Sequence, residues 1–600
     1  MKTVRLIVLI VQRVLITAGV FFTAAVVIHF TAIDPKERAI SCDRACNRAD
    51  WPRICRFELV VEKRTFRRDR AAVATDNVSL AAGERKRSDV IAYYTINGRY
   101  VGPTLTVCEN DFLVVDVENR IPGESIALHW TGQSQRRTPF MDGVPMITQC
   151  PIASFTRFQY KFQADRAGSH LYHGFTGAER TEGLIGAFIV RSAFEQKQSP
   201  IFSKFGNETV WLITALNGLL AVNGERGWQQ TLPFNWTNRA RVDLLRVRLL
   251  YAVGHCQHWL ELEDHELQVL ALDGNALGSP DGATTPVNRI LLHDGLRMDL
   301  SIRRRPVVPA VDDKIRPAYG IRLTPAVAGS GCEQAVFRLR YDNLLPHDQP
   351  MPLETGGGAA SVRDALIPPA TPRTLDLSGS FCSGVAKVLC PQELHGQANL
   401  FPAELAAYDA RLEFTIDVRT VDGEGPFGEP GQETVRSVNG FTFAFPSVLM
   451  LGEPANDELQ AHTCGGHRSL PRSCHPLMGR CECVHVEHIE AGHRVEMVLI
   501  NADPAADYVY HLHGHGVFVV GTATGHRSSP GKVVRNLRTP QQRDTIVVQR
   551  DSIVVVRFVA KNAGLWLLRE IGSSSWSRGL DVVLNVGAHP MDFDMPNLDN

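Results

Sequence analysis

The run YHLHGHG, from Tyr510 to Gly516, carries three histidines at alternate positions between glycines. Neighbouring side chains of a β-strand point to opposite faces, so His511 and His513 would project from the same face of one strand. Two imidazoles on one face supply half of a metal site, because imidazole is a ligand for zinc, copper and iron. The alternative is a packed strand that carries histidines for other reasons, so further ligands must come from elsewhere in the chain.

The elements that would position these histidines are short β-strands. Apolar runs bounded by Gly, Pro and Asn recur along the chain, such as FLVVDVENRIPGESIALHW and SIVVVRFVAKNAG, whereas long amphipathic helical patterns are scarce. This pattern predicts an all-β protein built from sandwiches or barrels. The length of 600 residues exceeds what one hydrophobic core organises, so several domains are expected.

The chain also repeats a local pattern. Strand pairs with a polar-aromatic edge recur near Asn119, Val253 and Asn501, which predicts three similar β modules. Residues 344–380 are rich in Pro, Gly and Ala and are expected to form a linker before the last module. The predicted segments are, in chain order, a signal peptide or signal anchor (1–33), a cysteine-containing basic lead-in (34–88), module 1 (89–195), module 2 (205–343), a linker region (344–400) and module 3 (401–590).

The N-terminal segment has the order of a secretion signal. Lys2, Arg5 and Arg13 precede an apolar run from Val14 to Phe30. This run is long for a cleaved signal and short for a spanning helix, so cleavage and an uncleaved membrane anchor both stay open. Either way the remainder is predicted to be secreted or to lie on the extracellular side of a membrane. Glycans are then expected at the sequons of Asn207 and Asn235, and a third sequon begins at Asn77.

The cysteines agree with export. The sequence contains 13 cysteines, and an odd number leaves at least one unpaired. A late group could form a zinc knuckle, but an oxidising compartment favours disulfides. That group consists of Cys464, Cys474, Cys481 and Cys483.

The charge balance argues against a polyanionic partner. Lys and Arg number 63 against 64 Asp and Glu, so there is no overall field that would attract nucleic acid. A local basic run from Lys63 to Arg70 is interpreted as a solvated linker, with polyanion binding as the alternative.

Four stretches together resemble the multicopper oxidases of the laccase type. They are LHWTGQSQRRTPFMDGVPMITQCPI, AGSHLYHGFTGAERTEGLIGAFIV, YHLHGHGVFVVG and NAGLWLL, and they occur in the family's order. The opening CDRACNRADWPRICRFEL is similar to the cysteine-rich lead-in of insect-type laccases. The resemblance implies three cupredoxin-like β-sandwich (Greek-key) modules, with coppers held by the first and the third.

The resemblance also places the ligands of a blue (type 1) copper, which are two histidines, a cysteine thiolate and a weak axial group. Tyr508 and Ser575 stand at the two histidine positions, Glu570 stands at the thiolate position, and Leu580 is axial. Leucine is common at the axial position of active relatives. The other three residues cannot replace the missing ligands, so no type 1 copper is expected.

The same alignment leaves four of the eight histidines of the three-copper cluster: His129, His173, His511 and His513. His129 and His511 match the ligands of the single type 2 copper, and His173 and His513 match ligands of the copper pair. Thr131, Phe175, Arg569 and Ile571 occupy the lost positions. Strand alternation aims Arg569 at the cluster, where its charge would oppose a metal ion. Copper binding is therefore expected to be weak and incomplete, and hydrogen-bonded interface histidines are the alternative.

Three functions follow as hypotheses. The first is an extracellular laccase relative without oxidase turnover that binds an unknown extracellular protein or small molecule. The second is a copper-dependent oxidoreductase of altered chemistry on a residual histidine site. The third is a metal-binding protein without turnover that uses the same residues. Fold alone does not choose among them.

Overall fold

The computed structural model describes residues 11–23, 41–47, 49–69, 88–193, 208–232, 245–278, 285–305, 318–341, 374–378, 382, 388–397, 401–424, 429–452, 456–465, 471, 474, 481–525, 530–572 and 579–587. Residues 1–44 and 45–600 form two compact units. The first unit contains a helix over residues 11–23. Among the described residues, no helix is both long and apolar enough to cross a membrane. Part of the predicted signal or anchor run lies outside the described residues, as do the asparagines of all three sequons.

The first sandwich of the second unit pairs two four-stranded sheets, ordered β2-β1-β4-β6 and β3-β8-β7-β5. Their bounds are β1 Ile54–Asp69, β2 Ser88–Ile96, β3 Leu105–Cys108, β4 Phe112–Asn119, β5 Leu128–Thr131, β6 Arg157–Gln163, β7 Gly168–Gly174 and β8 Ile185–Arg191. The predicted boundary at residue 89 is wrong, because β1 lies in the presumed lead-in and pairs with both β2 and β4. Lys63 and the basic residues up to Arg68 therefore belong to a strand of the first sheet and not to a solvated linker, and Arg70 lies outside the described residues.

The second sandwich pairs two seven-stranded sheets, ordered β10-β9-β12-β17-β14-β15-β22 and β11-β19-β18-β13-β16-β20-β21. Their bounds are β9 Glu208–Leu216, β10 Leu219–Val222, β11 Gln229–Leu232, β12 Leu245–Ala252, β13 His258–Leu262, β14 His265–Leu272, β15 Asn275–Gly278, β16 Arg289–Leu292, β17 Arg297–Arg304, β18 Ala318–Pro325, β19 Ala335–Tyr341, β20 Thr374–Asp376, β21 Val388–Leu389 and β22 His395–Gly396. The last three lie in the predicted linker region, so its later part completes the second sandwich.

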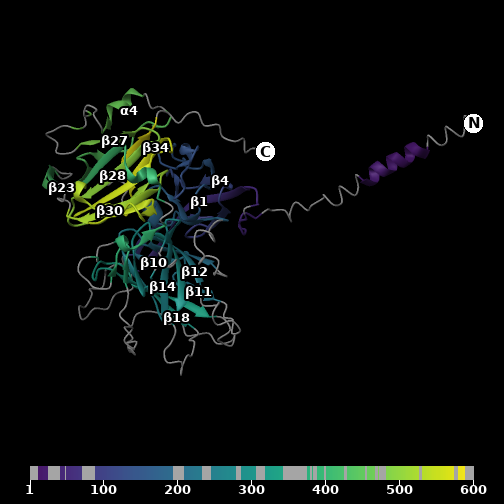
Figure 1. Cartoon of the computed structure of the whole chain (residues 1–600), viewed down its shortest axis with the longest axis horizontal. Helices are drawn as coiled ribbons and strands as arrows, with labels where there is room; N and C mark the ends of the chain where they lie inside the picture. The colour runs from purple at the N-terminus through teal and green to yellow at the C-terminus, as the bar shows by residue number, and fades with distance from the viewer. Residues whose placement is uncertain are drawn as a thin grey trace, which may run out of the picture. The chain divides into compact units, whose positions relative to one another are not determined.

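The third sandwich pairs the sheet β24-β23-β28-β33-β30-β31 with the sheet β25-β27-β35-β34-β29-β32, and β26 joins the latter beside β27. The bounds are β23 Ala410–Glu424, β24 Pro430–Val438, β25 Thr442–Phe443, β26 Thr463–Cys464, β27 Glu482–Ile489, β28 Arg494–Asn501, β29 Tyr508–Leu512, β30 Val517–Thr524, β31 Gln541–Arg543, β32 Thr545–Val548, β33 Ser552–Val559, β34 Gly564–Glu570 and β35 Val582–Val586. The strands of this sandwich are green to yellow in Figure 1, while β10, β12, β14 and β18 of the second are teal.

Helices are short. The described helices of the second unit are η1 Pro139–Met141, α2 Gly177–Thr181, η4 Pro391–Glu393, η5 Ala403–Ala406, α4 Asp457–Ala461 and η7 Pro530–Lys532. The prediction of an all-β chain of three sandwiches is thereby confirmed.

The internal repeat is visible in the pairing. In each sandwich the first long strand forms an antiparallel hairpin with its successor, and it also pairs in parallel with the next central strand (β1 with β4, β9 with β12, β23 with β28). Asn119 and Asn501 end β4 and β28 and make matching hydrogen bonds. Each side-chain amide donates to the carbonyl five residues on, and each side-chain oxygen accepts from the N–H two residues on.

Two apolar clusters join the sandwiches. Leu565 and Leu567 of β34 pack with Val144 and Phe175 of the first sandwich, whereas the alternate residues Trp566 and Leu568 fill the core of the third. Leu171 of β7 packs with Leu212 and Leu250 of the second sandwich. Strands β34 and β7 therefore each present one face to a neighbouring sandwich.

The cysteines form disulfides, as predicted for an oxidising compartment. The described pairs are Cys46–Cys108, Cys256–Cys332, Cys382–Cys390, Cys464–Cys483 and Cys474–Cys481. The late cysteine group is thus oxidised and does not form a zinc knuckle. Cys150 is free and exposed, which agrees with the odd total.

Candidate metal centre

The four histidines singled out by the sequence lie together between the first and third sandwiches. His129 on β5 and His173 on β7 are direct neighbours across the strand pair. The ring centroid of His129 lies 5.6 Å from that of His173, 5.4 Å from that of His511 and 3.9 Å from that of His513. The predicted convergence is confirmed, although more than 300 residues separate the two pairs in the sequence.

Three of these rings are held by the same kind of hydrogen bond, from Nδ1 to an oxygen atom of an aspartate. Nδ1 of His129 lies 2.7 Å from the carbonyl oxygen of Asp142, and Nδ1 of His511 lies 3.0 Å from that of Asp544. Nδ1 of His513 lies 2.7 Å from a carboxylate oxygen of Asp142. Carbonyl and ionised carboxylate oxygens only accept hydrogen bonds, so each Nδ1 carries the proton.

The fixed tautomers leave a lone pair on each Nε2. Nε2 of His129 lies 3.3 Å from Nε2 of His511. Two lone pairs at this separation repel each other unless a cation or a proton lies between them. Two ligands of one tetrahedral ion, each at ~2.0 to 2.1 Å, would stand about 3.3 Å apart. Donor atoms of His129, His511 and His513 all lie within 4.8 Å of one another, so the geometry suits one metal ion.

Burial and mutual repulsion favour the neutral forms of His511 and His513. The three side chains are almost fully buried. Burial lowers the pKa of His513 to about 4, and the charges of His129 and Arg569 act in the same direction. Burial, followed by the neighbouring imidazoles, holds the pKa of His511 well below its ordinary value. Neutral rings are the form that binds metal.

Asp142 links the two halves of the site. This carboxylate is fully buried at the end of η1, and it contacts both His513 and, at 3.4 Å, Nδ1 of His129. Burial acts to raise the pKa of Asp142, yet the imidazoles of His513 and His129 outweigh it and hold that pKa below the usual range. A carboxylate that orients ligand imidazoles is the usual outer support of a metal site.

His173 lies in the cluster without offering a free nitrogen. Its Nδ1 lies 2.8 Å from the carbonyl oxygen of Gly174 and therefore donates. Its Nε2 lies 2.7 Å from the hydroxyl of Thr131 and accepts from it. Thr131 stands at a position where the resemblance places a lost histidine. Its hydroxyl occupies the Nε2 lone pair of His173, which would otherwise be free to bind a metal ion. The predicted set of four histidines thus contains three with free Nε2 atoms.

The other replaced positions contact one another. Arg569 lies opposite His511 in the β29–β34 pair, and its guanidinium stacks 3.8 Å from the ring centroid of Phe175. Both residues stand at lost histidine positions. As predicted from strand alternation, Arg569 faces the cluster. Burial lowers the pKa of Arg569, but a guanidinium keeps its charge. Among the described residues, its Nη1 has no hydrogen-bond partner.

The region that the resemblance aligns with a blue copper contains hydrogen-bonded oxygen groups. The Tyr508 hydroxyl donates to Asp503 at 2.7 Å, and Glu570 accepts from the N–H of Gly572 at 2.8 Å. Leu580 is buried, and its carbonyl accepts from Tyr510 at 3.1 Å. Ser575 lies outside the described residues.

Two glycines shape the histidine cluster. Gly514 has φ +69°, and a Cβ there would lie 2.4 Å from the indole of Trp566, so only glycine lets the chain turn directly after His513. Gly143 has φ +83°, and a Cβ there would lie 1.8 Å from the carbonyl oxygen of Leu128. Glycine therefore allows the segment that carries Asp142 to pack against β5.

The sequence interpretation missed Asp142 and the role of Thr131. A signal for Asp142 existed, since FMDGVP places a single acidic residue among apolar neighbours. The contact between Thr131 and His173 depends on the register of β5 against β7, which the sequence does not specify.

Comparisons with known proteins agree with this arrangement. Family models described as multicopper oxidase match residues 77–194 and 456–570. An L-ascorbate oxidase of Brassica rapa subsp. pekinensis is 24% identical over 533 residues, covering 78% of this chain and 84% of that protein. Laccase-1 of Cryptococcus neoformans var. grubii is 23% identical over 516 residues, covering 79% of this chain and 74% of that protein.

A solved structure supports the fold. The crystal structure of Fet3p, a multicopper oxidase that functions in iron import, superposes with a TM-score of 0.62 at 19% identity. The match covers 91% of this chain and 93% of Fet3p. At this identity the likeness concerns the fold alone.

Proposed function

The chain belongs to the multicopper oxidase family, and we propose that it is an extracellular member without oxidase turnover that acts as a binding protein. The observation that carries this proposal is the environment of Glu570. It is buried, it accepts a hydrogen bond from Gly572, and it stands where the resemblance places the thiolate that receives the substrate electron. A carboxylate offers no soft sulfur ligand, so this position does not fit a blue copper.

The surroundings of Glu570 support the same conclusion. Tyr508 stands at a lost histidine position and donates its hydroxyl proton to Asp503. Among the described cysteines, the only free thiol is that of Cys150, which is exposed. No substitute thiolate is therefore available in the described part of this region. Without an electron-accepting centre here, substrate oxidation has no route to the histidines.

The histidine cluster favours a second candidate function. The 3.3 Å separation of the Nε2 atoms of His129 and His511, and the carbonyl oxygens that accept from both Nδ1–H groups, fit one metal ion held together with His513. Bound there, an ion would supply a Lewis acid that polarises water. Arg569 opposes it, because a buried positive charge beside the site raises the cost of a divalent cation. We therefore infer weak, single-ion binding, with a metal-binding role or altered oxidoreductase chemistry as the alternative function.

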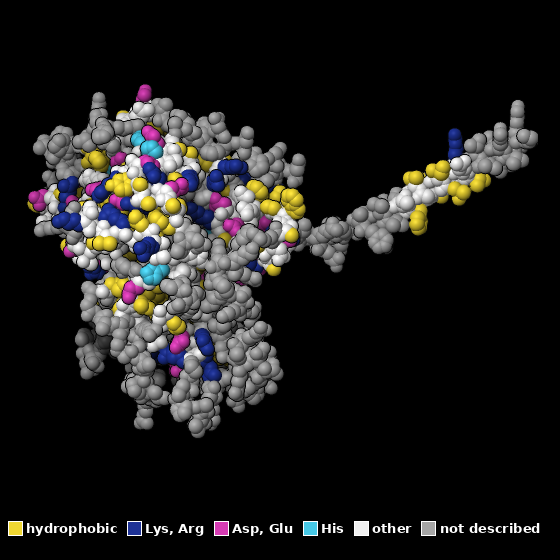
Figure 2. All heavy atoms as spheres, viewed as in Figure 1, with side chains coloured by type: hydrophobic (Ala, Val, Ile, Leu, Met, Phe, Trp, Pro, Cys, Tyr) yellow, Lys and Arg dark blue, Asp and Glu magenta, His cyan; other side chains and the backbone are white. Residues whose placement is uncertain are grey.

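The proposals about location and partners are supported by the disulfides and by the mixture of charged side chains. Disulfides favour an oxidising compartment, which agrees with export behind the N-terminal apolar run. Basic and acidic side chains are interspersed over the described part of the face seen in Figure 2. That mixture favours an extracellular protein or a small molecule as the partner over nucleic acid. Membrane anchoring through the N-terminal segment stays part of the proposal.

One experiment separates the candidates. The purified full chain is assayed for oxygen consumption with a diphenol and with ferrous iron, after copper loading and after chelator dialysis. A laccase measured in parallel is the positive control. We expect no oxygen uptake above the rate of free copper in either state. Copper-dependent turnover that survives removal of free copper would overturn the proposal and support altered oxidoreductase chemistry.

A further inference from the structure

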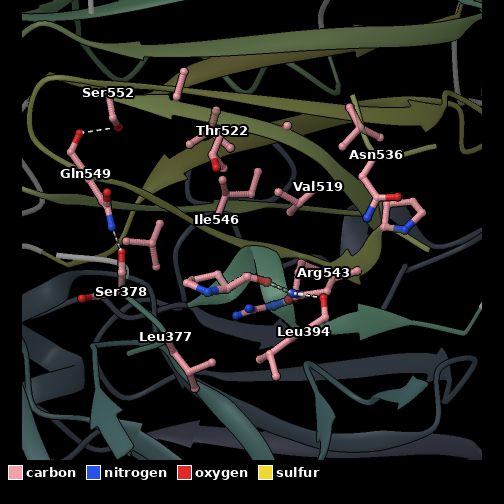
Figure 3. A pocket seen from close by; sticks show the side chains of 18 of the residues that line it. Leu377, Ser378, Leu394, Val519, Thr522, Asn536, Arg543, Ile546, Gln549 and Ser552 are labelled. Atoms are coloured by element: carbon pink, nitrogen blue, oxygen red, sulfur yellow. Dashed lines mark hydrogen bonds between the residues drawn. The ribbon is translucent and has the colours of Figure 1, made fainter. Parts of the chain in front are cut away.

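A cavity of about 560 Å³ lies between the third sandwich and the last strands of the second. Strands β30, β32 and β33 form one side of it, and residues around β20 and η4 form the other (Figure 3). Its lining contains none of the four histidines. The volume is in the range of small-molecule sites, which span roughly 300 to 1,000 Å³.

Aliphatic side chains contribute to both sides of the cavity. Val519, Ile546 and Val554 contribute from the third sandwich, and Leu377 and Leu394 contribute from the second. Figure 3 shows Leu377 and Leu394 on one side, with Val519 and Ile546 across the cavity from Leu377. These side chains suit an apolar body, because burying its surface is favourable by about 25 cal/mol per Å².

The charged groups of the lining have one sign. Among the described lining residues none carries a carboxylate, and the two charged side chains are Arg535 and Arg543. Arg535 is paired with Glu496, to which it donates at 2.9 Å, and it also donates to the carbonyl of Pro530 at 2.9 Å. Arg543 is therefore the cation that a ligand in the cavity would meet.

Arg543 keeps an unused donor. Its residue is 6% exposed, and its Nε donates to Asp273 at 2.7 Å. Its Nη2 is buried and has no hydrogen-bond partner among the described residues. Leaving a buried donor without an acceptor is costly, so such a group in a cavity wall indicates that a ligand supplies the acceptor.

We propose that this cavity binds a small apolar monocarboxylate, with the carboxylate accepting from Arg543 and the apolar body against Val519, Ile546 and Leu377. A single negative charge fits, because Asp273 already balances part of the Arg543 charge and no second free cation lines the described cavity. A phosphate or a polyanion would require more cations. The proposal goes beyond the function proposed above and holds with or without metal at the histidines.

Octanoate is the test probe, and 1-octanol is its neutral counterpart of the same length. Binding to the full chain is measured by titration calorimetry in the presence of EDTA. We expect one octanoate per chain, bound at least tenfold more tightly than octanol, because a charge-assisted hydrogen bond is lost with the alcohol. Equal binding of both would show an apolar cavity without carboxylate recognition, and no octanoate binding would overturn the site.

Two variants locate the site. Val519→Trp places a large side chain in the cavity and should abolish octanoate binding, whereas Val336→Trp on the exposed part of β19 is the matched control and should bind normally. Arg543→Lys keeps a cation for Asp273 but lacks the second nitrogen, and it should weaken octanoate about tenfold while octanol is unchanged. Thermal unfolding without ligand checks that each variant is folded. Octanoate binding that survives Val519→Trp would place it elsewhere and contradict the proposal.

None of these readouts depends on oxidation or on metal. Failure of octanoate binding would therefore leave the proposed lack of oxidase turnover unaffected. Conversely, discovery of oxidase activity would not alter the calorimetric result.

Discussion

Two regions of this chain align with copper sites of the family: the histidine cluster and the region of the blue copper. They differ in how the residues around the lost ligands are hydrogen-bonded. In the histidine cluster, backbone carbonyls and Asp142 still hold the Nδ1 protons of three rings, and the Nε2 atoms of His129 and His511 lie 3.3 Å apart. In the region aligned with the blue copper, Tyr508, Tyr510 and Glu570 have hydrogen-bond partners from the protein itself.

The difference follows from the cost of leaving buried polar groups unpaired. A tyrosine or glutamate introduced into a core requires a partner, and Asp503 and the Gly572 N–H provide it. The histidine cluster has one such adjustment, between Thr131 and His173, and one stacked pair, between Arg569 and Phe175. Neither involves the Nε2 atoms of His129, His511 and His513, whose spacing still suits a cation.

The largest expected effect is the loss of metal affinity on substituting a histidine, and it should differ between His511 and His173. His511→Ala removes one of the three free Nε2 atoms and should weaken Zn²⁺ or Cu²⁺ binding by at least about 100-fold, more than the loss of an outer support. His173→Ala should change affinity less than about 3-fold, because both nitrogens of His173 are bonded to the protein. Competition titration with a chromophoric chelator measures both. A larger loss in His173→Ala would restore His173 to the ligand set.

In the region aligned with the blue copper, the stability of the folded protein should depend on pH through Asp581. Burial raises the pKa of Asp581 to about 6, although Arg569 acts in the opposite direction. Between about pH 4 and 6 the folded state binds the proton that the unfolded state has lost, so stability falls as pH rises through this window. A shift of about two pH units corresponds to about 3 kcal/mol.

Asp581→Asn should remove this loss. Relative to the natural protein, its free energy of unfolding should rise by about 3 kcal/mol between pH 4 and pH 7. Urea unfolding at both pH values in EDTA measures the change. The exposed Asp422→Asn is the control and should show no such trend. A constant difference between variant and natural protein would refute a protonated Asp581 in the folded state.

Smaller losses of stability are expected on removing the tyrosine hydrogen bonds of the region aligned with the blue copper. Tyr508→Phe removes a donor to a carboxylate and should cost about 1.5 to 3 kcal/mol, whereas Tyr510→Phe removes a donor to a neutral carbonyl and should cost about 0.5 to 1.5 kcal/mol. Both hydroxyls are buried, so packing losses are matched. Denaturant unfolding at neutral pH gives the order. A reversed order would mean that Asp503 does not depend on Tyr508.

The smallest expected effect is that of a single restored ligand. Glu570→Cys should produce neither a blue absorption band nor diphenol oxidation, because Tyr508 remains at one histidine position and no full ligand set forms. Absorption spectroscopy of the copper-loaded variant measures this. An intense blue band would show that the rest of the site tolerates copper after all.

Strand alternation and the repeated edge at Asn119 and Asn501 are local signals, and they predicted the all-β class and the three modules. The meeting of the four histidines was predicted from the resemblance to the multicopper oxidases. The sequence also placed Arg569 on the face of the cluster. It did not predict that β1 completes the first sheet, since parallel pairing with β4 leaves no local pattern. The engagement of His173 by Thr131 and the support from Asp142 depend on contacts between elements, which the sequence does not encode locally.

Electron paramagnetic resonance of the full chain during copper titration, and again after chelator dialysis, tests the central claim most directly. The predicted result is one copper per chain at saturation with a type 2 signal, nitrogen hyperfine structure that changes in His511→Ala, no blue absorption band, and loss of the copper on dialysis. A type 1 signal, or stoichiometric copper that survives chelator dialysis, would contradict the account.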